Sequence, residues 1–338
     1  MENILVTGGA GFIGSNFIRY LLNESDDVNI INYDCLTYAG NLANLKDIEN
    51  NRNYRFVKGD IKNSEFLEFI INEYKISGII NFAAESHVDR SIENSRPFID
   101  TNIVGTLNIL EAVKKLHVKS FLQVSTDEVY GSLGAEGFFT ETTSLSPNSP
   151  YSASKSSADQ LCLAFNHTFG IDVKITRCSN NYGPMQFPEK LIPLMISNAL
   201  EDKELPIYGD GMNIRDWLYV DDHCSAIWEV FKNGKSGEVY NVGGNNEKAN
   251  IEIVKGILSQ LGKPESLIKY VKDRPGHDRR YAIDNSKIKN ELGWEPKVDF
   301  ETGIKMTIQW YLDNKEWSKH VRSGEYLNFY NKWYGDKF

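Results

Sequence analysis

Two short motifs carry side chains that could handle protons. Tyr151 and Lys155 form a Y-x-x-x-K pair, and Thr126 is followed directly by Asp127 and Glu128. A spacing of four places Tyr151 and Lys155 on one face of a helix. A free tyrosine has a pKa of about 10 and is a poor base near neutral pH, but a nearby lysine ammonium favours its ionised form. The pair therefore predicts a tyrosine that removes a proton and whose pKa is lowered by Lys155.

A glycine-rich segment near the first residues could bind a dinucleotide. Gly8, Gly11 and Gly14 form G-x-x-G-x-x-G, and an overlapping G-x-G-x-x-G is present as well. One glycine permits a tight turn, another lets the backbone approach a pyrophosphate, and the last allows a helix to pack closely on a strand. The helix that follows, beginning at Phe12 and Ile13, would offer unpaired N–H groups to the phosphates.

Two aspartates sit where predicted strands end. Asp34 lies 20 residues after Gly14, where a carboxylate can bind the ribose 2′-OH of NAD. No arginine follows nearby to bind a 2′-phosphate, so NAD is favoured over NADP as the cofactor. Asp60 and Ile61 are placed to border the adenine ring, although an aspartate at a strand end is often only a turn former. Lys155 can also hold the nicotinamide ribose.

Strands and helices alternate through the first half of the chain. Short apolar runs predict strands over 3–7, 28–33, 54–57, 78–82, 120–125 and 173–177. Apolar residues at helical spacing predict helices over 12–23, 64–74, 97–117 and 151–169. This alternation predicts an α/β fold, a Rossmann-type doubly wound parallel sheet with helices on both faces.

Local signals mark the ends and faces of two of these helices. Ser64 is the expected N-cap of the helix over 64–74, and Gly170 should end the helix over 151–169. The expected buried face of the first helix consists of Phe66, Leu67, Phe69 and Ile70.

The rhythm changes after about residue 179, where prolines and tight turns accumulate. We expect an NAD-binding domain over 1–178 and a smaller α/β substrate domain over 179–211 and 245–338. The segment 212–244 should return to the first domain's sheet, with strands over 217–220 and 238–242 and a helix over 221–231.

Composition excludes several classes of protein. The 338 residues suit about two domains. The net charge of -9, without a basic stripe, disfavours nucleic-acid binding. The four cysteines have no zinc or C-x-x-C spacing and are expected to be buried thiols in a reducing compartment. The first residues have no signal-type pattern and no uncharged stretch nears the roughly 20 residues that span a bilayer, so we expect a cytoplasmic protein.

These motifs together resemble the extended short-chain dehydrogenase/reductase superfamily. The glycine motif, Thr126, Tyr151 and Lys155 carry the resemblance. The acid pair after Thr126 and further segments resemble one branch, the nucleotide-sugar 4,6-dehydratases. These segments are 83–91, 178–184, 246–250 and 273–281. The resemblance extends from the first strand to about Trp294, and the segment from about 300 to 338 carries no signature that we can use.

The resemblance implies a reaction and a role for each reactive side chain. The implied substrate is dTDP-glucose, which would lose water to become a 4-keto-6-deoxy sugar nucleotide, with NAD tightly held and regenerated. Thr126 would hydrogen-bond the 4-OH while Tyr151, helped by Lys155, takes its proton. Loss of water needs one group that gives a proton and one that takes a proton. The resemblance assigns Asp127 as the acid at the C6 oxygen and Glu128 as the base at C5.

The resemblance also implies binding residues and a partner. Those implied beside the cofactor are Ala83, Ala84, Ser86, Thr101 and Asn181, with Ser86 also facing the sugar. Those implied for the substrate are Asn180, Lys190, Leu191, Pro206, Tyr208, Arg215, Asn250, Arg274, His277 and Tyr281. Two guanidiniums suit a diphosphate by their fork geometry. The helices over 97–117 and 151–169 would form a four-helix homodimer contact, while burial against the sheet also explains much of their apolar pattern. Their apolar residues are Leu107, Ile109, Leu110, Leu161, Leu163 and Phe165.

Two other functions remain open at this point. The protein could be a 4,6-dehydratase or a 4-epimerase of another nucleotide sugar such as UDP-glucose. The acid pair, Asp127 and Glu128, argues against an epimerase but does not separate dTDP from UDP. A catalytically silent protein that senses NAD(H) would not need Tyr151, Lys155 and the acid pair together.

Overall fold

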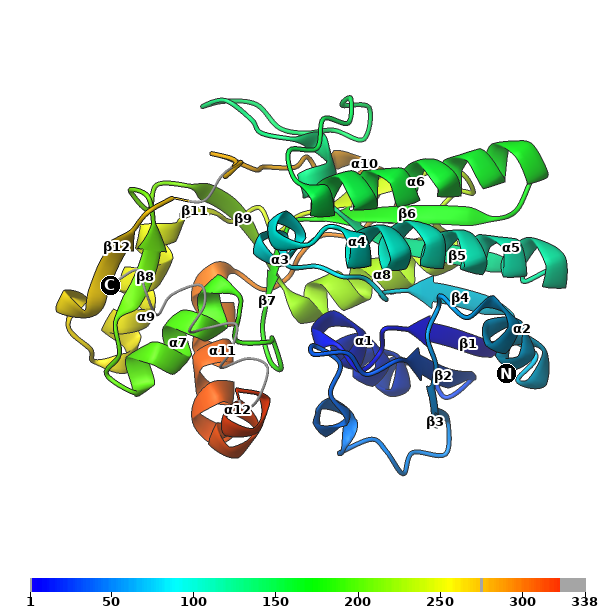
Figure 1. Ribbon diagram of the computed structural model, residues 1–338, viewed down its shortest axis with the longest axis horizontal. Helices are drawn as coiled ribbons and strands as arrows, with labels where there is room; N and C mark the ends of the chain where they lie inside the picture. Colours follow the sequence, from blue (N-terminus) through cyan, green and yellow to red (C-terminus); the bar gives the residue numbers. More distant parts are fainter. Residues whose placement is uncertain (1, 274–275, 323–338) are drawn as a thin grey trace.

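The computed structural model describes residues 2–273 and 276–322 and is built around one large parallel sheet (Figure 1). Its seven strands follow the order β10-β6-β5-β4-β1-β2-β3. They are β1 (Glu2–Thr7), β2 (Val28–Asp34), β3 (Tyr54–Lys58), β4 (Gly78–Asn81), β5 (Ser120–Thr126), β6 (Val173–Cys178) and β10 (Val239–Val242). All neighbouring pairs are parallel, which confirms the predicted Rossmann-type fold.

Helices cover both faces of this sheet. On one face lie α1 (Phe12–Glu24), α8 (Val220–Asn233) and α10 (Ser286–Leu292), and on the other α2 (Ser64–Glu73), α5 (Thr106–Leu116) and α6 (Pro150–Phe169). In β1, Ile4 and Val6 pack toward α1 and α8 while Leu5 packs toward the opposite helices. Successive strand side chains alternate between faces, so a sheet buried on both sides needs the continuous apolar runs seen in the sequence.

The order of the strands determines where a ligand can bind. β1 lies between β2 and β4. The chain adds β2 and β3 on one side of β1 and then crosses to add β4, β5 and β6 on the other side. Such a switch point leaves a crevice at the carboxyl ends of the strands. The glycine-rich turn follows β1, and the segment 82–87 follows β4, so both are brought to this crevice.

The helix over 64–74 is present, but two details of its prediction were wrong. Asn63 is the N-cap, because its side chain accepts from the backbone N–H of Phe66 at 3.0 Å, and Ser64 is the first helical residue. Phe69 is 56% exposed, because it lies on the side of α2 away from Leu67 and Ile70.

The helix predicted over 97–117 is interrupted. It consists of α4 (Arg96–Phe98), the π-helical segment η2 (Ile99–Gly105) and α5, and it is preceded by the short helix α3 (Val88–Glu93). The buried Asn102 lies in the π-helical segment. Its side chain bonds the backbone N–H and carbonyl of Glu85, each at 2.9 Å, and donates to the Ser154 hydroxyl at 2.8 Å. The interruption therefore ties α6 to the segment after β4.

The remaining elements form a smaller unit. The strands β7 (Asn180–Tyr182), β9 (Ile214–Tyr219) and β11 (Glu247–Ala249) form one sheet, and β8 (Leu205–Tyr208) pairs with β12 (Ile268–Val271). The helices are α7 (Leu191–Leu200), α9 (Asn250–Leu261), α11 (Phe300–Asp313) and α12 (Lys315–Val321). Short 3-10 turns are η1 (Leu42–Leu45), η3 (Asp127–Tyr130) and η4 (Glu265–Leu267).

One strand does not return to the large sheet as expected. The strand predicted over 217–220 is part of β9, which pairs with β7 and β11, whereas β10 does pair with β6. The division into two domains at the stated boundaries stays a prediction. Within the described ranges, none of the helices combines the length and apolar character that crossing a bilayer requires.

Candidate active site

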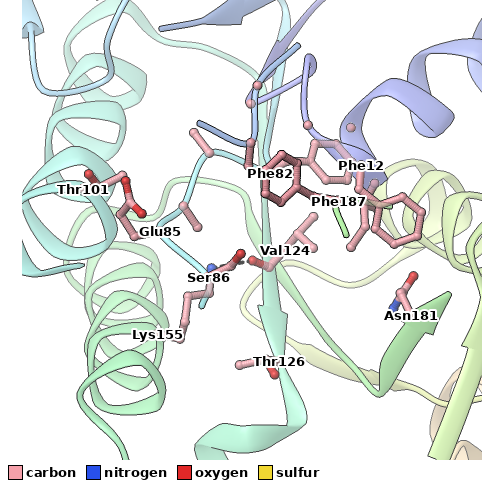
Figure 2. A pocket seen from close by; sticks show the side chains of 18 of the residues that line it. Phe12, Phe82, Glu85, Ser86, Thr101, Val124, Thr126, Lys155, Asn181 and Phe187 are labelled. Carbon is pink, nitrogen blue, oxygen red and sulfur yellow. Dashed lines mark hydrogen bonds between the residues drawn. The ribbon is translucent and has the colours of Figure 1, made fainter. Parts of the chain in front are cut away.

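A cavity of about 390 Å³ extends from the glycine-rich turn to the start of α6. Figure 2 shows Phe12, Phe82 and Phe187 together at one side of it, and Ser86, Thr126 and Lys155 at the other. Most of the predicted site residues line it. They are Gly8, Gly11, Phe12, Ile13, Gly14, Asp34, Asp60, Ile61, Ala83, Ala84, Ser86, Thr101, Thr126, Asp127, Glu128, Tyr151, Lys155, Asn180, Asn181, Lys190 and Leu191.

Two glycines of the glycine-rich turn have no room for a side chain. Gly8 has a φ of +71°, and a Cβ there would lie 2.6 Å from the backbone nitrogen of Ala83. A Cβ on Gly14 would lie 2.4 Å from the carbonyl oxygen of Gly8. Helix α1 begins after Gly11 without a side-chain cap, so its first N–H groups remain available to an anion. The turn therefore has the shape and donors of a pyrophosphate cradle.

Asp34 is held rigidly at the end of β2. Its two carboxylate oxygens accept from the backbone N–H groups of Ala10, at 2.9 Å, and Leu36, at 2.8 Å. Burial raises the pKa of Asp34, and these two hydrogen bonds oppose that effect. Asp60 is a turn former that also lines the cavity, because its side chain accepts from the backbone N–H of Lys62 at 2.9 Å.

Tyr151 and Lys155 enter the cavity from the first turns of α6. A reciprocal capping box between Ser149 and Ser152 fixes the start of this helix. Tyr151 and Lys155 are both buried. The Lys155 ammonium donates to the carbonyl of Val124 at 2.7 Å, which ties α6 to β5.

The pKa of Tyr151 is raised in this structure, whereas the sequence predicted a lowered one. Burial raises the pKa of the Tyr151 phenol well above its usual value, the nearby Glu128 and Cys178 raise it further, and a hydrogen bond with Thr126 opposes them. Burial lowers the pKa of Lys155. The ammonium is directed to the Val124 carbonyl, and the hydrogen bond with Thr126 favours the tyrosinate.

The two acids of the pair have different surroundings. Asp127 is 1% exposed and its Oδ1 lies 3.5 Å from the Thr126 hydroxyl. Burial raises the pKa of Asp127 well above its usual value, Glu128 and Asp216 add to the shift, and Arg215 opposes it. Glu128 is only half-buried. Neighbouring carboxyls in unequal surroundings can take opposite proton-transfer roles, with the buried one staying protonated.

Six of the predicted substrate residues that the structure describes do not line this cavity. They are Pro206, Tyr208, Arg215, Asn250, His277 and Tyr281. Arg274 lies outside the described residues. Tyr208 meets the ring of His277 edge-on, with centroids 6.1 Å apart. The Arg215 guanidinium lies 4.3 Å from the centre of the Tyr281 ring.

Arg215 and Tyr281 nevertheless interact electrostatically with the acid pair, Asp127 and Glu128. Arg215 lowers the pKa of Asp127, and Glu128 contributes to the raised pKa of Tyr281 after burial. Asn250, at the start of α9, has a buried Oδ1 without a hydrogen-bond partner among the described residues. Arg215 and Tyr281 thus act electrostatically on or with the acid pair, and the role of Asn250 in substrate binding stays a prediction.

The sequence did not point to a histidine that orients Asn181. His223 Nδ1 lies 2.8 Å from Asn181 Oδ1, and Asn181 Nδ2 donates to the Ser179 carbonyl at 3.0 Å. Since a carbonyl only accepts, the amide orientation is determined and His223 must donate through Nδ1. Burial lowers the pKa of His223 to about 3, so the ring is neutral. No local pattern could reveal a pair that is 42 residues apart.

Glu189 is a second residue that sequence reasoning missed. It lines the cavity, is buried, and lies 3.4 Å from the Arg90 guanidinium. Arg90 in turn lies 3.8 Å from the centre of the Tyr38 ring. Burial raises the pKa of Glu189, while Lys190 and Arg90 lower it. Its place next to Lys190 in the sequence, a predicted substrate residue, was the only sequence feature that we find to suggest that Glu189 lines the site.

Comparison with known proteins places this site in a family. Residues 5–307 match the family model described as GDP-mannose 4,6 dehydratase. The dTDP-glucose 4,6-dehydratase of Xanthomonas campestris pv. campestris (strain B100) is 55% identical, over 96% of this chain and 97% of its own. The NAD complex of dTDP-glucose 4,6-dehydratase from Bacillus anthracis str. Ames is 58% identical, with a TM-score of 0.90 over 95% of this chain and 100% of that one.

A UDP-glucose 4-epimerase from Thermotoga maritima has the same fold, with a TM-score of 0.86 over 93% of this chain and 99% of that one, at 32% identity. The fold alone therefore does not separate dehydratases from epimerases. The sheet, the glycine-rich turn and the Tyr151–Lys155 pair make the chain a member of the extended short-chain dehydrogenase/reductases. Within that class, it belongs to the family of dTDP-glucose 4,6-dehydratases, which are NAD-dependent hydro-lyases.

Proposed function

We propose that this protein converts dTDP-glucose into dTDP-4-keto-6-deoxyglucose and water, as a step in the synthesis of deoxysugar nucleotides. The proposal is supported by family membership and by the arrangement of Thr126, Asp127, Glu128 and Tyr151 around one cavity. The observation that carries it is the acid pair, because the elimination of water needs both a proton donor and a proton acceptor beside the redox site.

The residues that line the cavity fit NAD. The cradle at Gly8 and Gly14 excludes any Cβ, and Asp34 presents a carboxylate at the end of β2. The cradle would hold the pyrophosphate, Asp34 a ribose, and Lys155 the nicotinamide ribose. When bound, NAD would accept a hydride from C4 of the sugar and return it to C6. The cofactor is therefore unchanged after each turnover.

The chain itself supplies the proton transfers. Tyr151 takes the proton of the 4-OH in its ionised form, which the hydrogen bond with Thr126 favours against the effect of burial and the ammonium of Lys155 would favour as well. Thr126 would also hydrogen-bond the sugar oxygen. The 4-keto group makes the C5 proton acidic, and Glu128 removes it. Asp127, kept protonated by burial, delivers a proton to the departing C6 hydroxyl. Glu128 then returns its proton to C5. The proton that Tyr151 took from the 4-OH leaves the site and an equal one returns to Asp127 from solvent, so all three side chains are restored.

The outer part of the site would hold the nucleotide. Ser86 and Asn180 contact the sugar, and Lys190 enters next to Ser86, whose carbonyl accepts from the Lys190 ammonium at 3.0 Å. The diphosphate and base would contact Leu191, Pro206, Tyr208, Arg215, Asn250, Arg274, His277 and Tyr281. The unpartnered Oδ1 of Asn250 supports a ligand there, since buried polar atoms are normally paired.

We further propose that the protein is a cytoplasmic homodimer. Ile99 and Val104 on η2 and Phe169 on α6 are exposed apolar side chains on the helices expected to meet a second copy. Of the residues expected at this contact, Ile109 and Leu110 are instead buried against the sheet. Light scattering of the purified protein tests the dimer, and a Val104→Arg variant should be monomeric if this face is the contact.

Product analysis tests the proposed reaction. The purified protein is incubated in heavy water with dTDP-glucose and, separately, UDP-glucose, and the products are read by mass spectrometry and NMR. Loss of one water with deuterium at C5, faster with dTDP-glucose, is expected. A product of unchanged mass with inverted configuration at C4 would identify an epimerase. Faster conversion of UDP-glucose would show that the preferred nucleotide carries uracil instead of thymine. Turnover of neither sugar by a protein that binds NAD would contradict the proposal.

A further inference from the structure

The helices α11 and α12, which carry no recognisable motif, reach the cofactor half of the molecule. In Figure 1, they are the orange and red helices beside α7. We propose that Trp317 and Tyr311 are positioning residues that hold two walls of the NAD site in place and thereby slow the release of NAD. This inference rests on the proposed cofactor site.

The first wall is the glycine-rich turn. The Trp317 indole N–H donates to Asn44 Oδ1 at 2.8 Å, and Asn44 Nδ2 donates to the carbonyl of Ala10 at 2.9 Å. Because that carbonyl can only accept, the Asn44 amide has one orientation, and its oxygen faces the indole. The N–H of Ala10 in turn donates to Asp34 at 2.9 Å. Three hydrogen bonds therefore connect α12 to the carboxylate proposed to bind a ribose.

The second wall is the segment 184–187, which follows β7. The buried hydroxyl of Tyr311 donates to the carbonyl of Gln186 at 2.6 Å, and the Gln186 side chain donates to the carbonyl of Asn181 at 2.9 Å. Gln186, Phe187 and Asn181 all line the cavity. Met185, just before, has a φ of 64°. A non-glycine residue keeps this conformation only where its surroundings hold it.

The two connections share one aromatic cluster. The ring centroids of Trp310 and Trp317 are 4.9 Å apart, and those of Tyr311 and Trp317 are 6.1 Å apart. The opposite end of α11 is anchored by the buried Phe300 and Ile304 in the core of the smaller unit. α11 and α12 thus act as one strut from that core to both walls. Separating the walls to release NAD would break both hydrogen bonds.

Conservative variants test the strut. Trp317→Phe and Tyr311→Phe each keep an aromatic ring but lose the donor. Dissociation of NAD from the purified holoenzyme is followed by exchange with an excess of labelled NAD. Each variant should release NAD roughly 3- to 10-fold faster, the effect of losing one modest hydrogen bond, and the double variant faster still. Melting temperature is measured in parallel.

A matched control separates positioning from packing. Trp310→Phe alters the same cluster, but the Trp310 indole forms no hydrogen bond to a cavity residue in the described part of the chain. It should change the melting temperature without changing the release of NAD. In an Asn44→Ala background, Trp317→Phe should add nothing, because the connection is already cut.

Two results would overturn the inference. One is unchanged NAD release in both donor variants, and the other is acceleration by Trp310→Phe as large as that by Trp317→Phe. A wild-type protein that binds no NAD in a direct titration would instead contradict the proposed function. The two failures are therefore distinguishable.

Discussion

The Nε of Arg177, on β6, lies 2.8 Å from Asp159 Oδ2, and both side chains are buried. Asp159 lies one turn along α6 from Lys155. The Arg177 guanidinium also donates to the Tyr130 hydroxyl at 3.0 Å. Burial lowers the pKa of Lys155 and Asp159 opposes that effect, so the carboxylate helps Lys155 keep its charge. Cys162 and Cys178 are the other groups that act on Lys155 in the same direction. The pair thus links the core of the sheet to the proposed proton-transfer site.

Replacing Arg177 should therefore destabilise the protein strongly. Arg177→Met leaves Asp159 as an uncompensated buried charge, a change that typically costs about 3–5 kcal/mol of unfolding free energy. Urea denaturation measures it. The double variant Arg177→Met/Asp159→Asn removes the stranded charge and should recover part of the loss. Double-variant stability equal to the sum of the single losses would show that the two side chains do not act as a pair.

Two glycine substitutions should have opposite effects. Gly8→Ala places a Cβ 2.6 Å from a backbone nitrogen at a positive φ, and should lower both stability and NAD affinity, the latter by at least roughly tenfold. Gly256→Ala, in α9, has no atom within 4 Å of its new Cβ and should stabilise by about 0.5–1 kcal/mol. Calorimetry and an NAD titration measure both. Equal NAD affinity of the Gly8→Ala variant and wild type would place the cofactor elsewhere.

Substitutions of Asp127 and Glu128 should impair two different steps of the reaction. Asp127→Asn should still oxidise C4 but lose water at least about 100-fold more slowly, the usual contribution of a general acid. Glu128→Gln should lose the exchange of the C5 hydrogen with solvent. Absorbance of reduced cofactor follows the first step, and NMR in heavy water follows the exchange. An Asp127→Asn variant that dehydrates normally would show that another group is the acid.

Asp127 should also make stability depend on pH. Its pKa is raised in the folded state, so between about pH 4, the unfolded value, and the folded pKa, the folded protein holds more protons than the unfolded chain. The free energy of unfolding therefore falls as pH rises through this window. Asp127→Asn removes this loss, so its stability relative to wild type should increase with pH. Parallel stability curves for the two proteins would contradict a raised pKa at Asp127.

The large sheet and most of the cavity could be predicted because local patterns encode them. Apolar runs such as 28–33 must be buried on both faces, and Gly170 ends α6 in the left-handed conformation, as predicted. The spacing from Gly14 to Asp34 is maintained by one strand–helix–strand unit. Such features depend on neighbours in the sequence.

The errors concern choices that local patterns leave open. Asn63 and Ser64 are both residue types that favour the N-cap position. The backbone takes up helical geometry from Ser64 onward, so Asn63 is the residue that caps α2. The apolar residues of β9 suit either sheet. Pairing with β7, which is distant in the sequence, determines that β9 joins the smaller sheet. The raised pKa of Tyr151 depends on how deeply the packed structure buries the phenol. The contact between Asn44 and Trp317 joins residues 273 apart, beyond any motif.

The most direct test of the account follows the hydrogen on C4. Tyr151, Asp127 and Glu128 around one cofactor site predict an internal redox cycle in which the hydride removed from C4 returns to C6 of the same molecule. dTDP-glucose carrying deuterium at C4 is incubated in ordinary water, and the product is examined by NMR. We predict a 4-keto product with the deuterium in the C6 methyl group. Deuterium found at C4 of an inverted sugar, or lost to solvent, would contradict the account.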